Sequence, residues 1–174
     1  MAGCSSGTTH VVGTSGQIGP LHVDRSGEAA VIAFAGKPDA TATGTAPGYD
    51  RYRALGYGCR GKGFDAEARI VGQCQTVFFV DQRTRKLETF STSSPQYSES
   101  HGVRIGMKQA DAERLLHKRL TVGCTTALAF DSPTGSLSID FRGGVEHGTA
   151  IKGAHVDAFI VHGHLRDAGV FDCL

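Results

Sequence analysis

The sequence predicts an α+β fold of two tandem repeats, each a short helical segment followed by antiparallel strands. Two observations support this prediction: a strand-and-helix pattern occurs twice, and a hairpin pattern follows each copy. A chain of 174 residues is long enough to bury one shared core. We expect a flexible tether over residues 1–17, a first repeat over 18–100 and a second repeat over 101–174.

The strand-and-helix pattern lies in segments 21–38 and 103–119. Each begins with alternating apolar residues and continues with the spacing of a short helix. In the second copy, Ala112, Leu115 and Leu116 fall on one helical stripe, and charged residues cover the opposite side. Such a stripe is typical of a helix that packs on a sheet. We therefore expect one such helix in each repeat.

The hairpin pattern lies in segments 80–90 and 130–141, each an apolar strand, a turn and another strand. Asp81 and Asp131 stand at the turns, where an aspartate side chain can bond the nearby backbone. Gly135 tolerates the positive φ that a reversal often needs. The sequence therefore predicts a β-hairpin after each helix.

The first repeat differs from the second by a long stretch at about 39–73, which we expect to be an inserted loop. Long ordered loops are commonly functional, and rigid tyrosine rings are frequent anchors of interfaces. The loop also contains arginines, which make charged and stacking contacts. An alternative stays open, in which the tyrosines only seal the loop onto the sheet. The predicted partner-binding residues are Tyr49, Arg51, Tyr52, Tyr57 and Arg60.

The later cysteines form an even set without a Cys-x-x-Cys pair, so two disulfides are expected in preference to a zinc site. Three pairings are possible. We favour Cys59 with Cys74 and Cys124 with Cys173, which places one bridge in each repeat. Disulfides persist in oxidising compartments, so the pattern indicates an extracellular or cell-envelope protein. The alternative is four reduced, buried cysteines in a cytosolic protein.

The remaining cysteine, Cys4, stands in Ala2-Gly3-Cys4-Ser5, which is similar to the tail of a bacterial lipobox. In a lipobox the cysteine becomes the lipidated first residue, and the tether over 1–17 would then be its spacer. Because no stretch of about 20 apolar residues is present, we expect membrane contact only through a lipid on Cys4. A chance cysteine in a leader is the alternative.

Charge argues against nucleic acid as a partner, because 18 Lys and Arg nearly balance 17 Asp and Glu. The Gly-rich segment 56–63 resembles a phosphate loop, but Gly63 stands where a Ser or Thr hydroxyl must meet magnesium. No serine lies in a Gly-x-Ser-x-Gly elbow, and no pair of carboxylates suggests an acid and a base. We expect no cofactor and favour a protein that is not an enzyme.

One alternative to a binding protein uses the last apolar strand, which contains His155, Asp157, His162 and His164. Alternation predicts the first two on one face of that strand and the last two on the other. One face then offers only two metal ligands, whereas a catalytic zinc needs three from the protein. A third ligand would have to come from elsewhere, such as His117, His147 or Asp172.

The repeat unit resembles that of the β-lactamase inhibitor protein and of the small outer-membrane assembly lipoproteins. The resemblance rests on Ile105-Gly106-Met107 and Leu115-Leu116 within 103–119, and on Gly36-Lys37-Pro38-Asp39 in the first copy. It implies sheets joined into one concave face, helices behind that face, and an exported protein. No target-contacting residue of that family matches a position here, so the resemblance implies no inhibitory target.

Together these patterns predict an exported or lipid-anchored bacterial cell-envelope protein that binds another protein or an envelope component. The concave sheet and the tyrosine-rich loop would form its docking surface. The alternative is a small extracellular enzyme or metal-binding protein that uses the C-terminal histidines.

Overall fold

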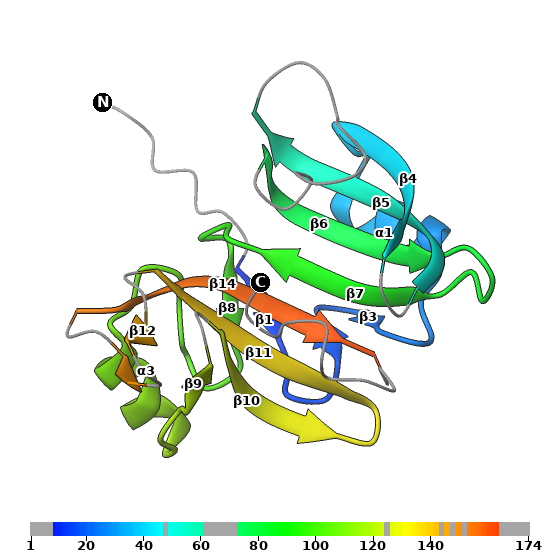
Figure 1. The fold of residues 1–174 in the computed structure, drawn as a ribbon. Coiled ribbons are helices and arrows are strands. Elements are labelled where there is room, and N and C mark those ends of the chain that lie inside the picture. The colour runs from blue at the N-terminus through cyan, green and yellow to red at the C-terminus, as the bar shows by residue number, and fades with distance from the viewer. Residues whose placement is uncertain are drawn as a thin grey trace.

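A computed structural model of the chain describes residues 9–46, 49–60, 73–123, 126–142, 145–146, 149–150 and 153–163. Its two described helices are α1 (Glu28–Ala35) and α3 (Gln109–Leu116), and most of the other elements are strands (Figure 1). The strands are β1 (His10–Val12), β2 (Gln17–Ile18), β3 (Leu21–His22), β4 (Ala40–Ala46), β5 (Tyr49–Cys59), β6 (Cys74–Asp81), β7 (Leu87–Thr92), β8 (Tyr97–Glu99), β9 (Val122–Gly123), β10 (Thr126–Ser132), β11 (Gly135–Arg142), β12 (Val145–Glu146), β13 (Thr149–Ala150) and β14 (His155–His162).

The central sheet has eight strands in the order β4-β5-β6-β7-β14-β11-β10-β9, and all neighbours are antiparallel. Strands β4 to β7 precede α3 in the chain, and the other four follow it. The two groups meet where β7 pairs with β14, with Phe90 opposite Val161. The central sheet is thus one continuous surface that both halves of the chain build (Figure 1).

A smaller sheet has the order β3-β2-β1-β8, in which β1 and β8 run parallel. This arrangement contradicts the described part, residues 9–17, of the tether predicted over 1–17. His10–Val12 is a strand paired with Tyr97–Glu99, and the side chain of Val12 is fully buried. Two consecutive valines in β1 favour a strand, and the Gly, Ser and Thr around them hid this short signal. Residues 1–8, including Cys4, lie outside the described residues.

The main core lies on one face of the central sheet, where large apolar side chains point at both helices and at the smaller sheet. Phe78, Phe90 and Phe159 are fully buried there. Val31 of α1 and Leu116 of α3 join the same cluster. The two predicted helices are confirmed, and the α3 stripe is buried at Ala112 and Leu116 and half-buried at Leu115.

The two predicted hairpins are also present as β6–β7 and β10–β11. At the first turn the N–H of Thr84 donates to Asp81 Oδ1 at 2.5 Å. At the second, Gly135 has a φ of 145°, and the carbonyl oxygen of His162 lies only 2.8 Å from where a Cβ on Gly135 would stand. A glycine is required at that position because any side chain would collide with β14.

The prediction of an inserted loop at about 39–73 is wrong for most of the described residues in that range. Residues 40–46 and 49–59 are strands β4 and β5 of the central sheet, paired antiparallel with each other. The Thr, Gly and Pro content of this stretch is typical of a loop. The pairing with β6 overrides this weak local preference, because it buries Ala54 and Leu55 on opposite faces of β5.

In the described part of the chain, no helix has the length and apolar character needed to span a membrane.

Candidate functional site

The face of the central sheet opposite the main core, here called the second face, has its own smaller apolar cluster. Ala54 and Val77 lie on it, since their strand neighbours Leu55 and Phe78 point into the main core. Tyr52 also lies there, and its ring meets that of Phe79 edge-on with centroids 5.4 Å apart. This cluster forms the part of the second face that belongs to β4, β5 and β6.

Next to that cluster the second face is hollowed where β6 and β7 meet β14 and β11. This central hollow has a volume of about 510 Å³. Val77 and Ser91 are cross-strand neighbours in its floor, and so are Asp140 and Ala158. Most of the groups that line it are polar, so it suits a partner that forms hydrogen bonds more than an apolar small molecule.

Charged side chains of both signs stand around the central hollow. Arg142 Nη2 lies 3.0 Å from Asp157 Oδ1, and Asp140 Oδ1 accepts a hydrogen bond from the Thr126 hydroxyl at 3.3 Å. Arg60, at the end of β5, is exposed and lines the same hollow. The hollow therefore offers a cation at each side and acceptors between them, an arrangement that favours a polar partner surface.

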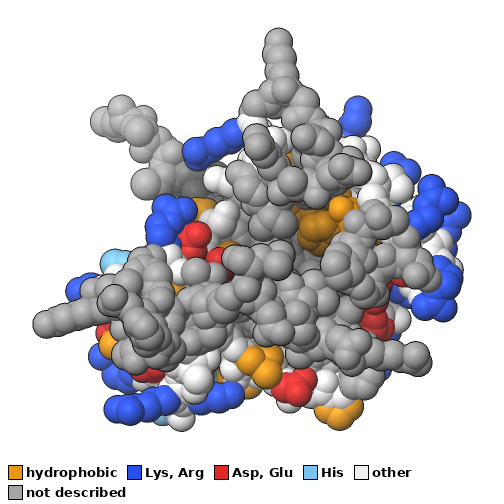
Figure 2. Space-filling model, viewed as in Figure 1, with side chains coloured by type: hydrophobic (Ala, Val, Ile, Leu, Met, Phe, Trp, Pro, Cys, Tyr) orange, Lys and Arg blue, Asp and Glu red, His pale blue; other side chains and the backbone are white. Residues whose placement is uncertain are grey.

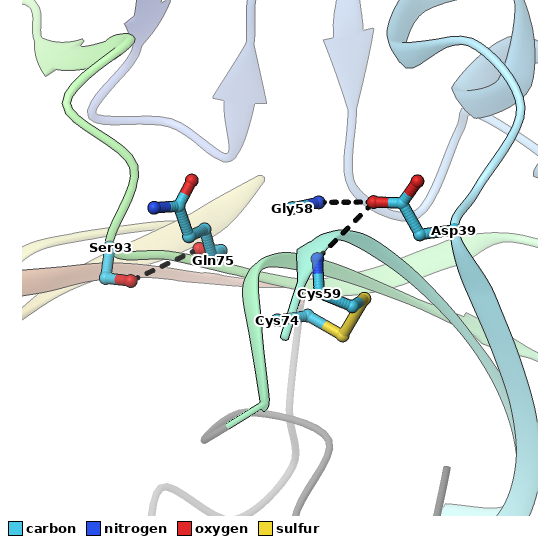
Figure 3. The surroundings of a disulfide bond; sticks show 6 residues. All are labelled: Asp39, Gly58, Cys59, Cys74, Gln75 and Ser93. Atoms are coloured by element: carbon cyan, nitrogen blue, oxygen red, sulfur yellow. Dashed lines mark hydrogen bonds between the residues drawn. A yellow bond between two sulfur atoms is a disulfide. The ribbon is translucent and has the colours of Figure 1, made fainter. Parts of the chain in front are cut away.

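A disulfide closes the β5 and β6 end of the hollow (Figure 3). Cys59 and Cys74 are opposite residues in the strand register and are bonded to each other, which confirms the predicted pair. Asp39 Oδ2 accepts hydrogen bonds from the N–H groups of Gly58, at 2.7 Å, and Cys59, at 3.3 Å. The rim is thus fixed by a covalent bond and by a carboxylate. The other predicted pair, Cys124 with Cys173, lies outside the described residues.

The five predicted partner-binding residues do not form one patch. They belong to a strand or its end rather than to a loop, and alternation sends neighbouring side chains to opposite faces. Tyr52 is buried on the second face, whereas the Tyr57 hydroxyl, near the main core, donates to the Gly36 carbonyl oxygen at 3.1 Å. Arg51 and Arg60 are exposed, and only Arg60 reaches the central hollow.

The side chain of Tyr49, the fifth of these residues, lies outside the described residues. Tyr57 has a structural role as well, because its ring meets Phe78 at 5.7 Å between centroids. Burial, reinforced by the nearby Asp39 and Glu28 carboxylates, raises the pKa of the Tyr57 hydroxyl above its usual value. Tyr52 and Tyr57 thus have packing roles, as the alternative of structural tyrosines expects, but within a strand of the sheet and not in a loop.

The histidines of β14 do not come together as a metal site. A register shift between Asp140 and Phe141 changes the alternation, so His155 pairs with Arg142 and His162 with Ser136. Arg142 and Ser136 lie on the same face of β11, which corrects the prediction that His155 and His162 point to opposite faces.

The two histidines are seven residues apart on one strand, roughly 23 Å, which is too far for a shared ion. Asp157 is already paired with Arg142. Burial lowers the pKa of His162 to about 4. Across the described residues no group of three His, Cys, Asp or Glu side chains is placed to hold a metal ion. His164 lies outside those residues.

A buried acid that sequence reasoning missed lies at the end of β8. The Glu99 side chain is fully buried and accepts hydrogen bonds from the Ser100 hydroxyl at 2.6 Å and the His101 N–H at 2.7 Å. The His101 ring Nδ1 lies 2.7 Å from Glu99 Oε1, and the ring stacks on Phe130 at 5.4 Å. These contacts hold a turn. A three-residue strand gives no periodic signal that could have marked Glu99 as buried.

Charge on the visible side of the molecule is dispersed. Figure 2 shows Lys and Arg side chains at several separate places around the outline, with acidic side chains between some of them. This distribution agrees with the near balance of charges in the sequence. It gives no continuous basic track of the kind that binds nucleic acid, among the described residues in this view.

The fold of this chain is shared with a solved structure. No protein-family model matches this chain, and no curated protein matches it. The crystal structure of the uncharacterized protein yfeY from Escherichia coli is similar, with a TM-score of 0.55 and 18% sequence identity. The match covers 89% of this chain and 99% of that one. The chain therefore shares its fold with yfeY.

Proposed function

We propose that this chain is an exported cell-envelope protein that binds another protein or an envelope component with the second face of its central sheet, and that it is not an enzyme. The observation that supports this most is the central hollow, because it lies where the two halves of the chain meet. A docking surface there would draw residues from both halves.

Export is supported by the Cys59–Cys74 disulfide, since such bonds persist in oxidising compartments and are rare in the cytosol. A lipid on Cys4 would add membrane attachment to the same picture. The bridge lies at the rim of the central hollow, and it would hold that rim in one conformation.

The order of elements supports an origin of the fold in two tandem repeats. Helix α1 precedes β4, β5, β6 and β7, and α3 precedes β9, β10, β11 and β14. Each group runs from an edge of the central sheet to its middle, in the same sequence. Two copies of one unit, joined through their last strands, would make the second face a single concave surface with both helices behind it.

The chemistry of the central hollow supports a protein partner or a polar envelope component. Arginine is enriched at protein interfaces because its fork binds carboxylates and its plane stacks on aromatic rings. Arg60 and Arg142 flank the hollow, and Gln75 and Ser93 lie beside its disulfide rim (Figure 3). Tyr52 and Phe79, whose rings pack edge-on next to the hollow, would stiffen this part of the second face.

A site-specific cross-linking experiment tests the proposal. A photo-reactive amino acid replaces Gln75, an exposed residue of the central hollow, and in a matched protein it replaces Ala110 on the exposed side of α3. Both proteins are incubated with envelope extract and illuminated. We expect one discrete cross-linked species from position 75 that position 110 does not give.

A charge change then locates the contact more closely. Arg60→Glu should greatly weaken that cross-link, whereas Arg25→Glu, at an exposed position near α1, should leave it intact. Equal labelling from positions 75 and 110, or no effect of Arg60→Glu, would show that the second face is not the docking surface.

A further inference from the structure

The outer edge of the central sheet at β4 differs from every other described edge. Natural sheets protect their edges with very short strands, charged side chains or prolines, because an unpaired edge can bond to another chain. Strand β9 at the opposite edge has two residues, and β3 at an edge of the smaller sheet also has two. Strand β4 has seven, none of them charged or a proline, and its pairing with β5 has a register shift between Gly44 and Ala46.

Strand β4 pairs with β5 on one side, and it is the last strand in the described order of the central sheet (Figure 1). Thr41 and Thr43 are exposed, and Ala42 is buried on the second face. The backbone groups on the outer side of such a strand form a row of donors and acceptors that matches another extended chain.

The sequence of β4 is close to a palindrome, and this identifies the kind of chain that fits. It reads Ala-Thr-Ala-Thr-Gly-Thr-Ala, which is nearly the same in both directions about Thr43. An antiparallel strand from a second copy, centred on Thr43, would place Ala opposite Ala at the ends, Thr opposite Thr at positions 41, 43 and 45, and Ala42 opposite Gly44. Cross-strand Thr pairs are favourable, and no like charges meet.

The residues beyond β4 limit this pairing to the strand itself. The sequence has proline at positions 38 and 47, on either side of it, and proline has no N–H to donate. A self-paired β4 would therefore have a defined length and a two-fold axis at Thr43. Two-fold pairing is closed, so it gives dimers and not fibres.

We propose that two copies of this chain associate through antiparallel pairing of their β4 strands, which joins their central sheets into one. This goes beyond the proposed function, because the edge at β4 lies outside the lining of the central hollow. A dimer would present two hollows to one partner or surface, and the gain would be in avidity.

Cysteine cross-linking tests the register. In an antiparallel pair, opposite Cβ atoms lie about 4.5–5.5 Å apart, close enough for a disulfide after mild oxidation. Thr43→Cys should therefore give a covalent dimer, and peptide mapping should find the new disulfide joining position 43 of one copy to position 43 of the other. Thr41→Cys should react more slowly, because its partner position is Thr45 of the second copy. Ala110→Cys on α3 is the matched control, and the native cysteines are the same in all three variants.

Charge repulsion gives a second, independent measurement. Light scattering during size-exclusion chromatography should show the wild-type mass rise from 18.3 kDa toward twice that value as concentration increases. The variant with Thr41→Lys and Thr43→Lys should remain at the monomer mass, because it places like charges across the two-fold axis. Ala29→Lys with Ala110→Lys adds the same charge on exposed helix positions and should still dimerise.

Either experiment can overturn the proposal. A wild-type chain that stays monomeric at all concentrations, or a lysine variant that dimerises as strongly as wild type, excludes pairing through β4. Cross-linking at position 43 that is no faster than at position 110 excludes it as well, and that measurement does not depend on how the lysine variant folds. If the dimer forms but position 75 gives no cross-link to a partner, the proposed function is contradicted and pairing through β4 is not.

Discussion

Asp39 Oδ2 accepts a hydrogen bond from the N–H of Gly58 at 2.7 Å, which ties the residue before β4 to the end of β5. Gly58 has a φ of 62°, and it stands next to the bridged Cys59 (Figure 3). The start of the sheet's edge strand and the disulfide rim of the central hollow are therefore mechanically connected. Changes to the bridge should be felt at β4 as well as in the hollow.

Removal of the bridge should reduce stability without unfolding the protein. The disulfide closes a loop with a sequence separation of 15, for which the loss of chain entropy in the unfolded state is worth about 3 kcal/mol. We expect Cys59→Ser with Cys74→Ser to lower the free energy of unfolding by about that amount in urea titrations.

The same variant also tests the second predicted bridge. If Cys124 and Cys173 are bonded, reductant should destabilise the double variant further. A double variant as stable as the wild type would contradict a structural role for the first bridge, and indifference to reductant would contradict the second bridge.

His162 should make the protein sensitive to acid. Burial lowers its folded-state pKa from 6.5 to about 4, so the folded state favours the neutral ring. This contribution to stability is complete above pH 6.5 and is lost as the pH falls through 4, up to about 3 kcal/mol. We expect His162→Gln to flatten the dependence of unfolding free energy on pH over that window. His155→Gln, at an exposed position on the same strand, should leave the dependence as in the wild type.

Glu88 should act in the opposite direction. Burial, together with the Asp81 and Asp24 carboxylates, raises its pKa from 4.5 to about 7. The folded state then favours the protonated acid, so stability from this group is complete below pH 4.5 and is lost as the pH rises through 7. We expect Glu88→Gln to gain stability over the wild type as the pH increases across this range. Asp131→Asn, at an exposed position near the end of β10, serves as the control, and a gain that does not vary with pH would refute this account.

The buried carboxylate of Glu99 should be essential to its turn. Glu99→Leu removes the acceptor for the Ser100 hydroxyl and the His101 N–H, and the net loss should be about 0.5–1.5 kcal/mol for each of these hydrogen bonds. Hydrogen–deuterium exchange should show faster exchange of the His101 amide. Glu99→Gln keeps the size and one acceptor oxygen, so its loss should be smaller. Equal effects of the two substitutions would mean that packing, and not hydrogen bonding, fixes this turn.

The sequence was informative where one face of an element is apolar and the other polar. The stripe of Ala112, Leu115 and Leu116 identified α3, and the apolar runs around Asp81 and Asp131 identified both hairpins. The even set of cysteines led to the pair Cys59–Cys74. Each of these signals comes from residues close together in the chain.

The sequence does not predict the parts of the structure that depend on pairing between distant segments. Strand β5 has buried residues on both faces, Ala54 on one and Leu55 on the other, so it lacks the simple alternation of a half-exposed strand. The face of His155 could not be predicted, because the register shift at Asp140 arises only when β11 pairs with β14. The central hollow was missed for the same reason, since its lining comes from strands that the topology alone brings together.

The place of β14 has a consequence for biosynthesis. It is the last described strand, yet it lies between β7 and β11 in the middle of the central sheet. A nascent polypeptide that ends before residue 155 therefore leaves two half-sheets. Each has an unpaired edge strand, β7 in one and β11 in the other. The domain can therefore mature only after residues 155–162 have been synthesised. Intermediates that stall before that point would be the species most prone to aggregate.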